Sequence, residues 1–390
     1  MTRPEPGNAW DSEKRSLLSR EDGIIVDLNG KRILIVKLRY IGDTLSVVPV
    51  VENLAKRSPG AAVDVLVNRG TEPVIACHPG IRKVWVYDYA LAKQKRWASF
   101  RYQRALIRDL RAERYDIVID YTHGDRAALL CFLTGARVRI THAHAGSLSR
   151  LLMNRFVDAD PAAHHIVDHQ LASLRLLGFE DLERTLSLHV PEAVQHRVDR
   201  WIERARLPQD RPWVVIHPGA RGPLRMWRPE RFAEIAGRVQ KRYGAAVILV
   251  GGPGEGDLLQ EVAAGMAQEP ALCTHELSLL EMGELLRRSS LFVGNDSAPG
   301  HLAAAVACPT VSLFGPTFPH MWRPLSPEGE VLFKNVPCCG CRQETCIRPE
   351  SGCMDMIGVD EVWERVRGIL EKRISGEGAV DPSATERGAA

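Results

Sequence analysis

Short apolar runs alternate with amphipathic stretches along the first half of the chain. The run at 32–36 is almost wholly apolar, as in strands that are buried on both faces of a parallel sheet. Similar patterns predict further strands at 62–67, 83–86, 116–120 and 137–140, and helices around 44–57, 71–77, 98–113 and 124–133. Strands and helices that alternate in this way predict a doubly wound parallel sheet.

A second series with the same alternation begins at Trp213–Ile216. It predicts strands at 246–250, 291–293 and 310–314, and helices at 229–243, 255–267, 279–288, 299–307 and 359–372. Between the two series, residues 141–212 carry no strong strand pattern and predict helices at 167–177 and 193–205. The polar, proline-bearing segment 206–212 is typical of a linker between domains.

These patterns together predict an α/β protein with two Rossmann-like, doubly wound domains that face each other across a cleft. The predicted divisions are a polar leader (1–29), a first domain (30–205), a linker (206–212), a second domain (213–357), a C-terminal helix (358–374) and a disordered tail (375–390). In such sheets ligands bind beyond the carboxyl ends of the strands, so the loops that follow the strands are the places for chemistry.

The composition agrees with two globular domains. With 390 residues, 45% of them hydrophobic and 25% charged, the chain is too long for one small core and too apolar for a disordered or fibrous protein. No apolar run approaches the roughly 18 residues that span a bilayer. The polar segment 1–22 has no apolar signal-peptide core. The sequence therefore predicts a soluble protein of the cytoplasm.

Asp43 follows the first predicted strand, in a loop where Gly42 allows a tight turn. An aspartate at this position is most simply an N-cap that accepts backbone N–H bonds at the start of the next helix. The alternative is a carboxylate at the lip of the cleft that takes a proton from a hydroxyl nucleophile.

The loop after the strand at 213–216 could bind an anion. His217 and Gly219 precede Arg225, so backbone N–H groups and a permanent cation are available together for a phosphate. A surface loop with Trp227 as an anchor for the next helix explains the same residues without a ligand.

The loop after the strand at 291–293 opens the helix at 299–307. Asp296 or Ser297 caps this helix, and its exposed N–H groups favour negative charge. Gly300 and His301 lie in its first turn, where the histidine could equally be structural. Because two anion-competent loops occur in one half of the chain, this half is predicted to bind a nucleotide.

Three strings carry a resemblance that runs from about residue 32 to 370: ILIVKLRYIGDTLSVVPVVENL, HPGARGPLRMWRPERFAEIA and LFVGNDSAPGHLAAAVACPTVSLFGPT. In sequence and order they resemble glycosyltransferase family 9, the heptosyltransferases that build the inner core of bacterial lipopolysaccharide. The stretch AAVDVLVNRGTEPVIACHPGIRKVWVYD is similar to the heptosyltransferase III branch in particular.

The resemblance implies a GT-B fold and an inverting, metal-independent transfer of heptose from ADP-heptose, with no cofactor required. It implies Asp43 as the general base, and donor contacts from the His217–Ala220 loop and the Asp296–His301 motif. Many members carry Lys-Arg before the tryptophan, where this chain has Arg225 and Met226. The residue types agree with this chemistry, since helix N–H groups and Arg225 can stabilise a leaving diphosphate.

Other functions stay open at this point. A family member could use another nucleotide sugar or a protein acceptor, and a nucleotide-sugar epimerase could share the fold. A relative without turnover could bind a saccharide or nucleotide alone. Acceptor-dependent release of ADP separates transfer from epimerisation.

The most basic stretch of the chain is 93–114, where eight Lys and Arg face two acidic residues. Its four central arginines recur at the spacing of one helix face: Arg101, Arg104, Arg108 and Arg111, here called the arginine row. An ordinary solvated face is the simplest explanation, but a row of four favours an anionic partner. Together with Arg39, it predicts a face for a lipid-linked anionic saccharide at the inner surface of the bacterial inner membrane, with a peripheral location there. No base-reading motif accompanies it, so no nucleic-acid partner is predicted.

Five of the nine cysteines lie within residues 338–353. Four of them have spacings that a structural zinc or iron–sulfur site can use: Cys338, Cys341, Cys346 and Cys353. Such a segment also occurs in some members of the family that the chain resembles. Reduced structural cysteines or a facultative disulfide explain the cluster more simply, and no catalytic role is indicated.

Overall fold

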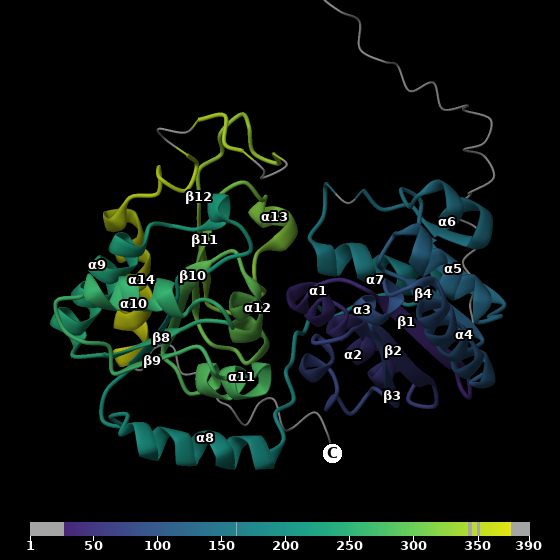
Figure 1. The fold of residues 1–390 in the computed structure, drawn as a ribbon, viewed down its shortest axis with the longest axis horizontal. Coiled ribbons are helices and arrows are strands. Elements are labelled where there is room, and N and C mark those ends of the chain that lie inside the picture. Colours follow the sequence, from purple (N-terminus) through teal and green to yellow (C-terminus); the bar gives the residue numbers. More distant parts are fainter. Residues whose placement is uncertain (1–26, 161, 342–344, 349–351, 376–390) are drawn as a thin grey trace, which may run out of the picture.

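The computed structural model describes residues 27–375, apart from 161, 342–344 and 349–351. Within this part of the chain, two six-stranded parallel sheets with flanking helices form two domains side by side (Figure 1). The predicted α/β class with two doubly wound domains is confirmed. Most of the predicted leader (1–29) and nearly all of the predicted tail (375–390) lie outside the described residues.

The first domain carries a sheet with the strand order β3-β2-β1-β4-β5-β6. Its strands are β1 (Arg32–Lys37), β2 (Ala62–Asn68), β3 (Lys83–Tyr87), β4 (Ile117–Asp120), β5 (Val138–His142) and β6 (Arg155–Val157). Its helices are α1 (Ile41–Leu45), α2 (Val48–Arg57), α3 (Tyr89–Ala92), α4 (Arg96–Ala112), α5 (Asp125–Leu133), α6 (Ser147–Leu152) and α7 (Ile166–Leu176), with a 3₁₀ turn at Glu72–Val74. The central strand β1 is fully covered from Ile33 to Val36, as its apolar run predicts.

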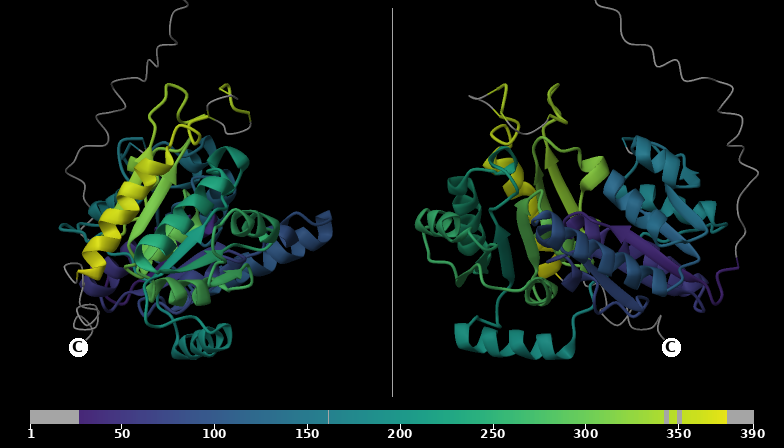
Figure 2. Two further views of the ribbon diagram at one scale, coloured as in Figure 1. Left: turned by 90° about the vertical axis from the view of Figure 1, so that its left-hand side faces the viewer. Right: turned by 45° about the vertical axis from the view of Figure 1, so that its right-hand side comes forward.

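The second domain repeats this arrangement with the order β12-β11-β10-β7-β8-β9. Its strands are β7 (Trp213–His217), β8 (Ala246–Val250), β9 (Leu272–Thr274), β10 (Leu291–Asn295), β11 (Thr310–Phe314) and β12 (Gly329–Phe333). Its helices are α9 (Pro229–Tyr243), α10 (Gly256–Ala264), α11 (Leu279–Arg287), α12 (Ala298–Ala305), α13 (Pro319–Trp322) and α14 (Val359–Ile374), with a 3₁₀ turn at Pro223–Arg225. The C-terminal helix α14, yellow in Figure 2, buries Val362 and Val366 in the core of this domain.

Both sheets reverse their strand order at the same place. In the first sheet β1 pairs with β2 on one side and β4 on the other, and in the second β7 pairs with β8 and β10. At such a point the two connections leave the sheet in opposite directions and open a crevice at the carboxyl ends of the strands. Asp43 lies just after β1, His217 is the last residue of β7, and Asp296 directly follows β10.

The chain crosses between the domains earlier than predicted. Helix α8 (Glu192–Ala205), which the predicted boundaries place in the first domain, lies beside α11 of the second (Figure 1). Ion pairs join the two helices, with 3.1 Å between Arg197 Nε and Glu281 Oε1. The crossing segment is instead 182–191, since Glu183 hydrogen-bonds Asn53 of α2 and the Leu188 N–H donates to Ala305 O of α12.

Three strands that the apolar pattern does not predict lie at sheet edges. They are β6, β9 and β12, two of them only three residues long. An edge strand is covered less completely than a central one, so its sequence need not be a continuous apolar run. In addition, the predicted helix at 44–57 is divided into α1 and α2, and the one at 71–77 is the short 3₁₀ turn. No helix in the described part of the chain is both long and apolar enough to cross a bilayer.

Candidate active site

A cavity of about 740 Å³ lies between the two domains, at both crevices. Asp43 of the first domain faces it, together with the loops that follow β7 and β10 of the second. The structure therefore brings most of the predicted site residues into one space: Asp43, His217, Arg225, Asp296, Ser297 and His301.

Asp43 lies in the first turn of α1 and is not its N-cap, which is Tyr40. The N-cap interpretation is therefore wrong. The Asp43 side chain is 19% exposed, and its Oδ1 atom lies 3.3 Å from Nζ of Lys37, the last residue of β1. The Lys37 side chain is 3% exposed and also donates to Tyr121 O at 3.2 Å. A fixed cation thus holds one side of a carboxylate that is otherwise open to the cavity.

Lys37 is a functional residue that the sequence analysis missed, because it completes an apolar strand. Burial lowers the pKa of Lys37, while the nearby Asp43 carboxylate favours its charged form. A lysine at the carboxyl end of a buried strand is the sequence feature that could have identified Lys37, because a buried ammonium group needs an anionic partner within reach.

The two halves of the cavity touch at His301. Its ring packs against the backbone of Gly42, where an added Cβ would lie 2.8 Å from His301 Cδ2. Burial lowers the pKa of His301, and the carboxylates of Asp296 and Asp43 act in the opposite direction. A second contact crosses the cleft where the Arg221 guanidinium lies 3.6 Å from the centre of the Tyr40 ring.

Arg225, predicted as a free cation for a phosphate, is bound to another predicted residue. Its Nη2 donates to Asp296 Oδ2, and Thr317 Oγ1 donates to the same carboxylate oxygen. The side chains of Arg225 and Asp296 are 12% and 7% exposed. The Arg225 Nε–H is buried and has no hydrogen-bond partner in the described part of the chain, so one donor of this guanidinium is still available.

His217 is held by Glu255, a residue that the sequence analysis did not identify. Glu255 Oε2 lies 3.2 Å from His217 Nε2 and accepts the Gly252 N–H at 2.6 Å, while His217 Nδ1 lies 3.3 Å from Ser297 Oγ. The hydrogen bond to His217 lowers the pKa of Glu255. Glu255 follows the glycine-rich turn at 251–254, which comes directly after β8.

The two predicted glycines pack against other residues. A Cβ at Gly219 would lie 2.0 Å from Glu255 Oε1, so the Glu255 carboxylate packs directly against this glycine. Gly300 is buried in α12, where a Cβ would meet Pro324 Cγ at 3.2 Å. Neither residue lines the cavity.

Comparison with known proteins agrees with this geometry. The family model of glycosyltransferase family 9 (heptosyltransferase) matches residues 103–351, more than half of the chain. The chain belongs to glycosyltransferase family 9. Lipopolysaccharide heptosyltransferase 3 of Escherichia coli is 33% identical to it over 294 residues, which are 74% of this chain and 85% of the relative. The family resemblance is therefore confirmed, and the chain is a glycosyltransferase.

Two solved structures of the family share the fold of this glycosyltransferase. The glycosyl transferase family 9 protein of Veillonella parvula DSM 2008 superposes with a TM-score of 0.79 at 23% identity, over 89% of this chain and 99% of that one. The E. coli ADP-heptose lipopolysaccharide heptosyltransferase II gives a TM-score of 0.70 at 22% identity, over 88% and 99%. The predicted GT-B architecture is confirmed.

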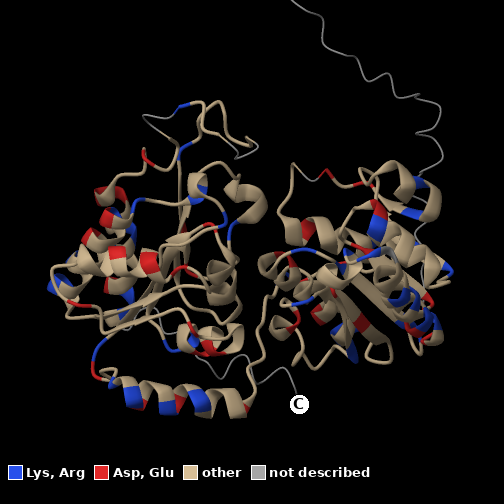
Figure 3. Cartoon of the chain, viewed as in Figure 1, with Lys and Arg blue, Asp and Glu red and all other residues tan. Residues whose placement is uncertain are grey.

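The arginine row of the glycosyltransferase is exposed on α4, at the edge of the first domain that points away from the second (Figure 3). Leu106 and Leu110 of the same helix are buried on its opposite face. Two aromatic side chains near the start of α4, Trp97 and Phe100, are also exposed, at 77% and 56%. Arg39 does not join this surface: it lies beside Asp43 in a second cavity of about 360 Å³ and donates to Thr122 O at 2.9 Å.

The cysteine segment of the glycosyltransferase lines a small hollow of about 160 Å³. In residues 27–375, leaving out the gaps given above, two groups of possible metal ligands lie close together, and neither contains a cysteine. Cys341 is exposed, whereas burial raises the pKa of Cys353. The described residues thus give the predicted four-thiolate site no support.

Proposed function

We propose that this glycosyltransferase transfers heptose from ADP-heptose to the inner core of lipopolysaccharide. The observation that carries the proposal is the shared cavity, in which Asp43 of one domain faces Arg225, Asp296 and His301 of the other. The similarity to lipopolysaccharide heptosyltransferase 3 supports the sugar and the acceptor, and the fold shared with an ADP-heptose heptosyltransferase supports the nucleotide.

In the proposed reaction Asp43 is the general base. Its carboxylate takes the proton of an acceptor hydroxyl while that oxygen attacks the anomeric carbon of the heptose. Attack from the face opposite the leaving ADP inverts the anomeric configuration. Lys37, with its Nζ atom 3.3 Å from Asp43 Oδ1, orients the carboxylate through this ion pair.

The second domain is proposed to stabilise the negative charge that grows on the leaving diphosphate. The Ala298 N–H at the start of α12 and the unpartnered Nε–H of Arg225 are donors fixed in place before the reaction. His217, Ser297 and His301 complete the donor-binding wall, and we propose that no metal ion is needed there. Gly219 and Gly300 contribute through the packing that they permit.

The acceptor is proposed to reach Asp43 from the first domain, at the cytoplasmic surface of the inner membrane. The arginine row and Trp97 offer positive charge and an aromatic side chain, the combination that binds anionic lipid surfaces. Arg39, beside Asp43, is proposed to contact an anionic group of the acceptor.

The proposal is tested by release of ADP from ADP-heptose in the presence of a lipid A–core acceptor that lacks the added heptose. A chelator is present throughout, and UDP and GDP sugars serve as controls. The proposal is supported if the acceptor causes release of ADP from ADP-heptose and causes no release of UDP or GDP from the control sugars. Transfer from a UDP or GDP sugar would agree with a glycosyltransferase but would refute ADP-heptose as its donor. Binding of ADP without transfer to any acceptor would refute transferase turnover.

A further inference from the structure

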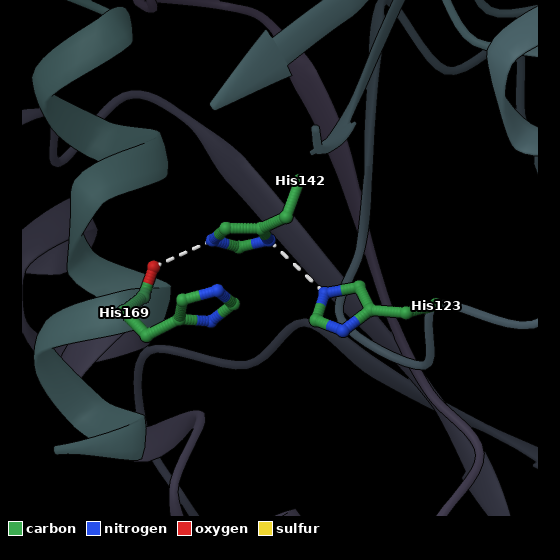
Figure 4. Close-up of side chains that lie close together, drawn as sticks. All are labelled: His123, His142 and His169. Atoms are coloured by element: carbon green, nitrogen blue, oxygen red, sulfur yellow. Dashed lines mark hydrogen bonds between the residues drawn. The ribbon is translucent and has the colours of Figure 1, made fainter. Parts of the chain in front are cut away.

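Three histidines of the first domain gather at the carboxyl ends of β4 and β5, outside the machinery proposed above. His123 follows β4, His142 is the last residue of β5, and His169 lies in α7 (Figure 4). One ring nitrogen of each lies within 4.8 Å of the others. His142 and His169 are buried, and His123 is partly buried at the wall of the 360 Å³ cavity that also contains Asp43.

The hydrogen bonds of His142 determine which of its nitrogens carries the hydrogen. Its Nε2 lies 2.6 Å from the carbonyl oxygen of His169, so Nε2 carries the hydrogen and donates it. The lone pair is therefore on Nδ1, which accepts a hydrogen bond from His123 Nε2 at 3.0 Å, and a bound metal ion would replace this bond. Two nitrogens bound tetrahedrally to one zinc ion are about 3.3 Å apart. Histidine ligands also usually donate their other N–H to a carbonyl or carboxylate.

His169 supplies an independent indication of a ligand. Both of its ring nitrogens are buried and have no hydrogen-bond partner in the described part of the chain. The backbone carbonyl of Ala159 lies near this ring but outside hydrogen-bond geometry. A buried polar group without a partner destabilises the fold unless something binds it. The ring stacks on His142 with 3.6 Å between centroids, so a turn of the His169 side chain would direct one nitrogen toward the other two.

We propose that His123, His142 and His169 bind one divalent transition-metal ion of the zinc type. The fourth position faces the cavity, where His144 lies with its ring centre 4.8 Å from that of His123. The ion joins α7 to the loops after β4 and β5 and so fixes the acceptor side of the cleft. It takes no part in stabilising the diphosphate, which the second domain holds.

The test is a titration of the full, chelator-treated chain with Co²⁺, followed by the visible absorption of nitrogen-bound tetrahedral cobalt, and with Zn²⁺ by calorimetry. One ion is expected per chain. His169→Leu should weaken binding at least about 10-fold, the range found for lesser changes around metal ligands. This substitution removes no hydrogen bond, so the metal-free variant should melt no lower than the metal-free parent. His196→Ala, on the exposed face of α8, is the control and should bind like the parent.

Two results would overturn the proposal. One is the absence of Co²⁺ and Zn²⁺ binding to the chelator-treated chain. The other is binding that His169→Leu leaves unchanged and that Cys338→Ser with Cys353→Ser removes, which would assign the ion to the cysteine segment. Both readouts are independent of heptose transfer, so they stand apart from the test of the proposed function.

Discussion

The imidazole of His301, in the second domain, lies directly against the backbone of Gly42 in the first, with no room for a Cβ between them. Asp43 is the next residue along the chain, so this contact sets the position of the proposed base relative to the start of α12. The proposed transfer depends on that spacing, because a misplacement of about 1 Å between reacting groups can lower a rate about 100-fold.

Gly42→Ala should lower the rate of heptose transfer about 10- to 100-fold. The new Cβ would lie 2.8 Å from His301 Cδ2, so the two domains must shift apart or the ring must move. Steady-state transfer kinetics measure the effect. Gly124→Ala is the matched control, since a Cβ there meets nothing within 4 Å and Gly124 has a φ of −114°. Equal rates for Gly42→Ala and the parent would show that the contact with His301 does not position Asp43.

Arg225→Met should destabilise the protein by about 3 kcal/mol or more, because it leaves the buried Asp296 carboxylate without its cation. It should also weaken ADP binding. Arg228→Met is the control, because Arg228 pairs with Asp355 at the surface, where water screens the pair and its loss should have little effect on stability. Denaturant unfolding and ADP calorimetry measure the two effects. Adding Asp296→Asn should recover part of the lost stability, and a double variant as unstable as the sum of the singles would argue against the pair.

The metal-free protein should lose stability as the pH falls from 7 toward 4. The pKa values of His165 and His169 are lowered to about 4 and that of His142 to about 3, chiefly by burial. Below the ordinary histidine pKa of about 6.5 the unfolded chain takes up protons that the folded chain does not, so acid favours unfolding. Each such histidine lowers the free energy of unfolding by about 1.4 kcal/mol for every pH unit between its unfolded and its folded pKa.

Denaturant unfolding at a series of pH values measures this loss. His169→Leu should make the dependence shallower between pH 6.5 and 4, because it removes one of the three groups. A free energy of unfolding that stays constant from pH 7 to 5 would show that these histidines are accessible to protons in the folded chain.

Arg104→Glu with Arg108→Glu should weaken binding to vesicles that contain anionic lipids at least about 10-fold, since each basic residue at such a surface contributes about 1 kcal/mol. Added salt should weaken the binding of the parent. Arg200→Glu with Arg204→Glu, on the exposed face of α8, is the control with the same change in charge. Equal vesicle binding by the two double variants would refute the arginine row as the membrane surface.

The sequence predicted the central strands and the loops that follow them, because strands such as β1 and β10 are buried on both faces and are continuous apolar runs. It did not predict the edge strands β6 and β9, whose three residues carry too little apolar pattern. Nor did it place α8 with the second domain. The apolar face of a helix shows that the helix packs against something, but it does not show which sheet or domain it packs against.

Within the site, the sequence identified the residues of the glycine-bearing loops and missed those that hold them. Glu255 supports His217 across 38 positions of the chain, and Lys37 belongs to a strand whose apolar neighbours hide it. The local pattern favoured an N-cap for Asp43, because capping is a local property, and the family resemblance implied a general base there. The pairing of Asp43 with Lys37 depends on how the turn into α1 directs the side chain. The cluster of His123, His142 and His169 depends on the tertiary fold, because its members come from elements that are separate in the sequence.

The measurement that tests the proposed mechanism most directly is Asp43→Asn, assayed for heptose transfer and for ADP binding in the same preparation. The side chain keeps its size and loses its ability to take a proton, so transfer should fall about 100- to 10,000-fold while the affinity for ADP stays within about twofold of the parent. Transfer near the parent rate would contradict the assignment of Asp43 as the general base.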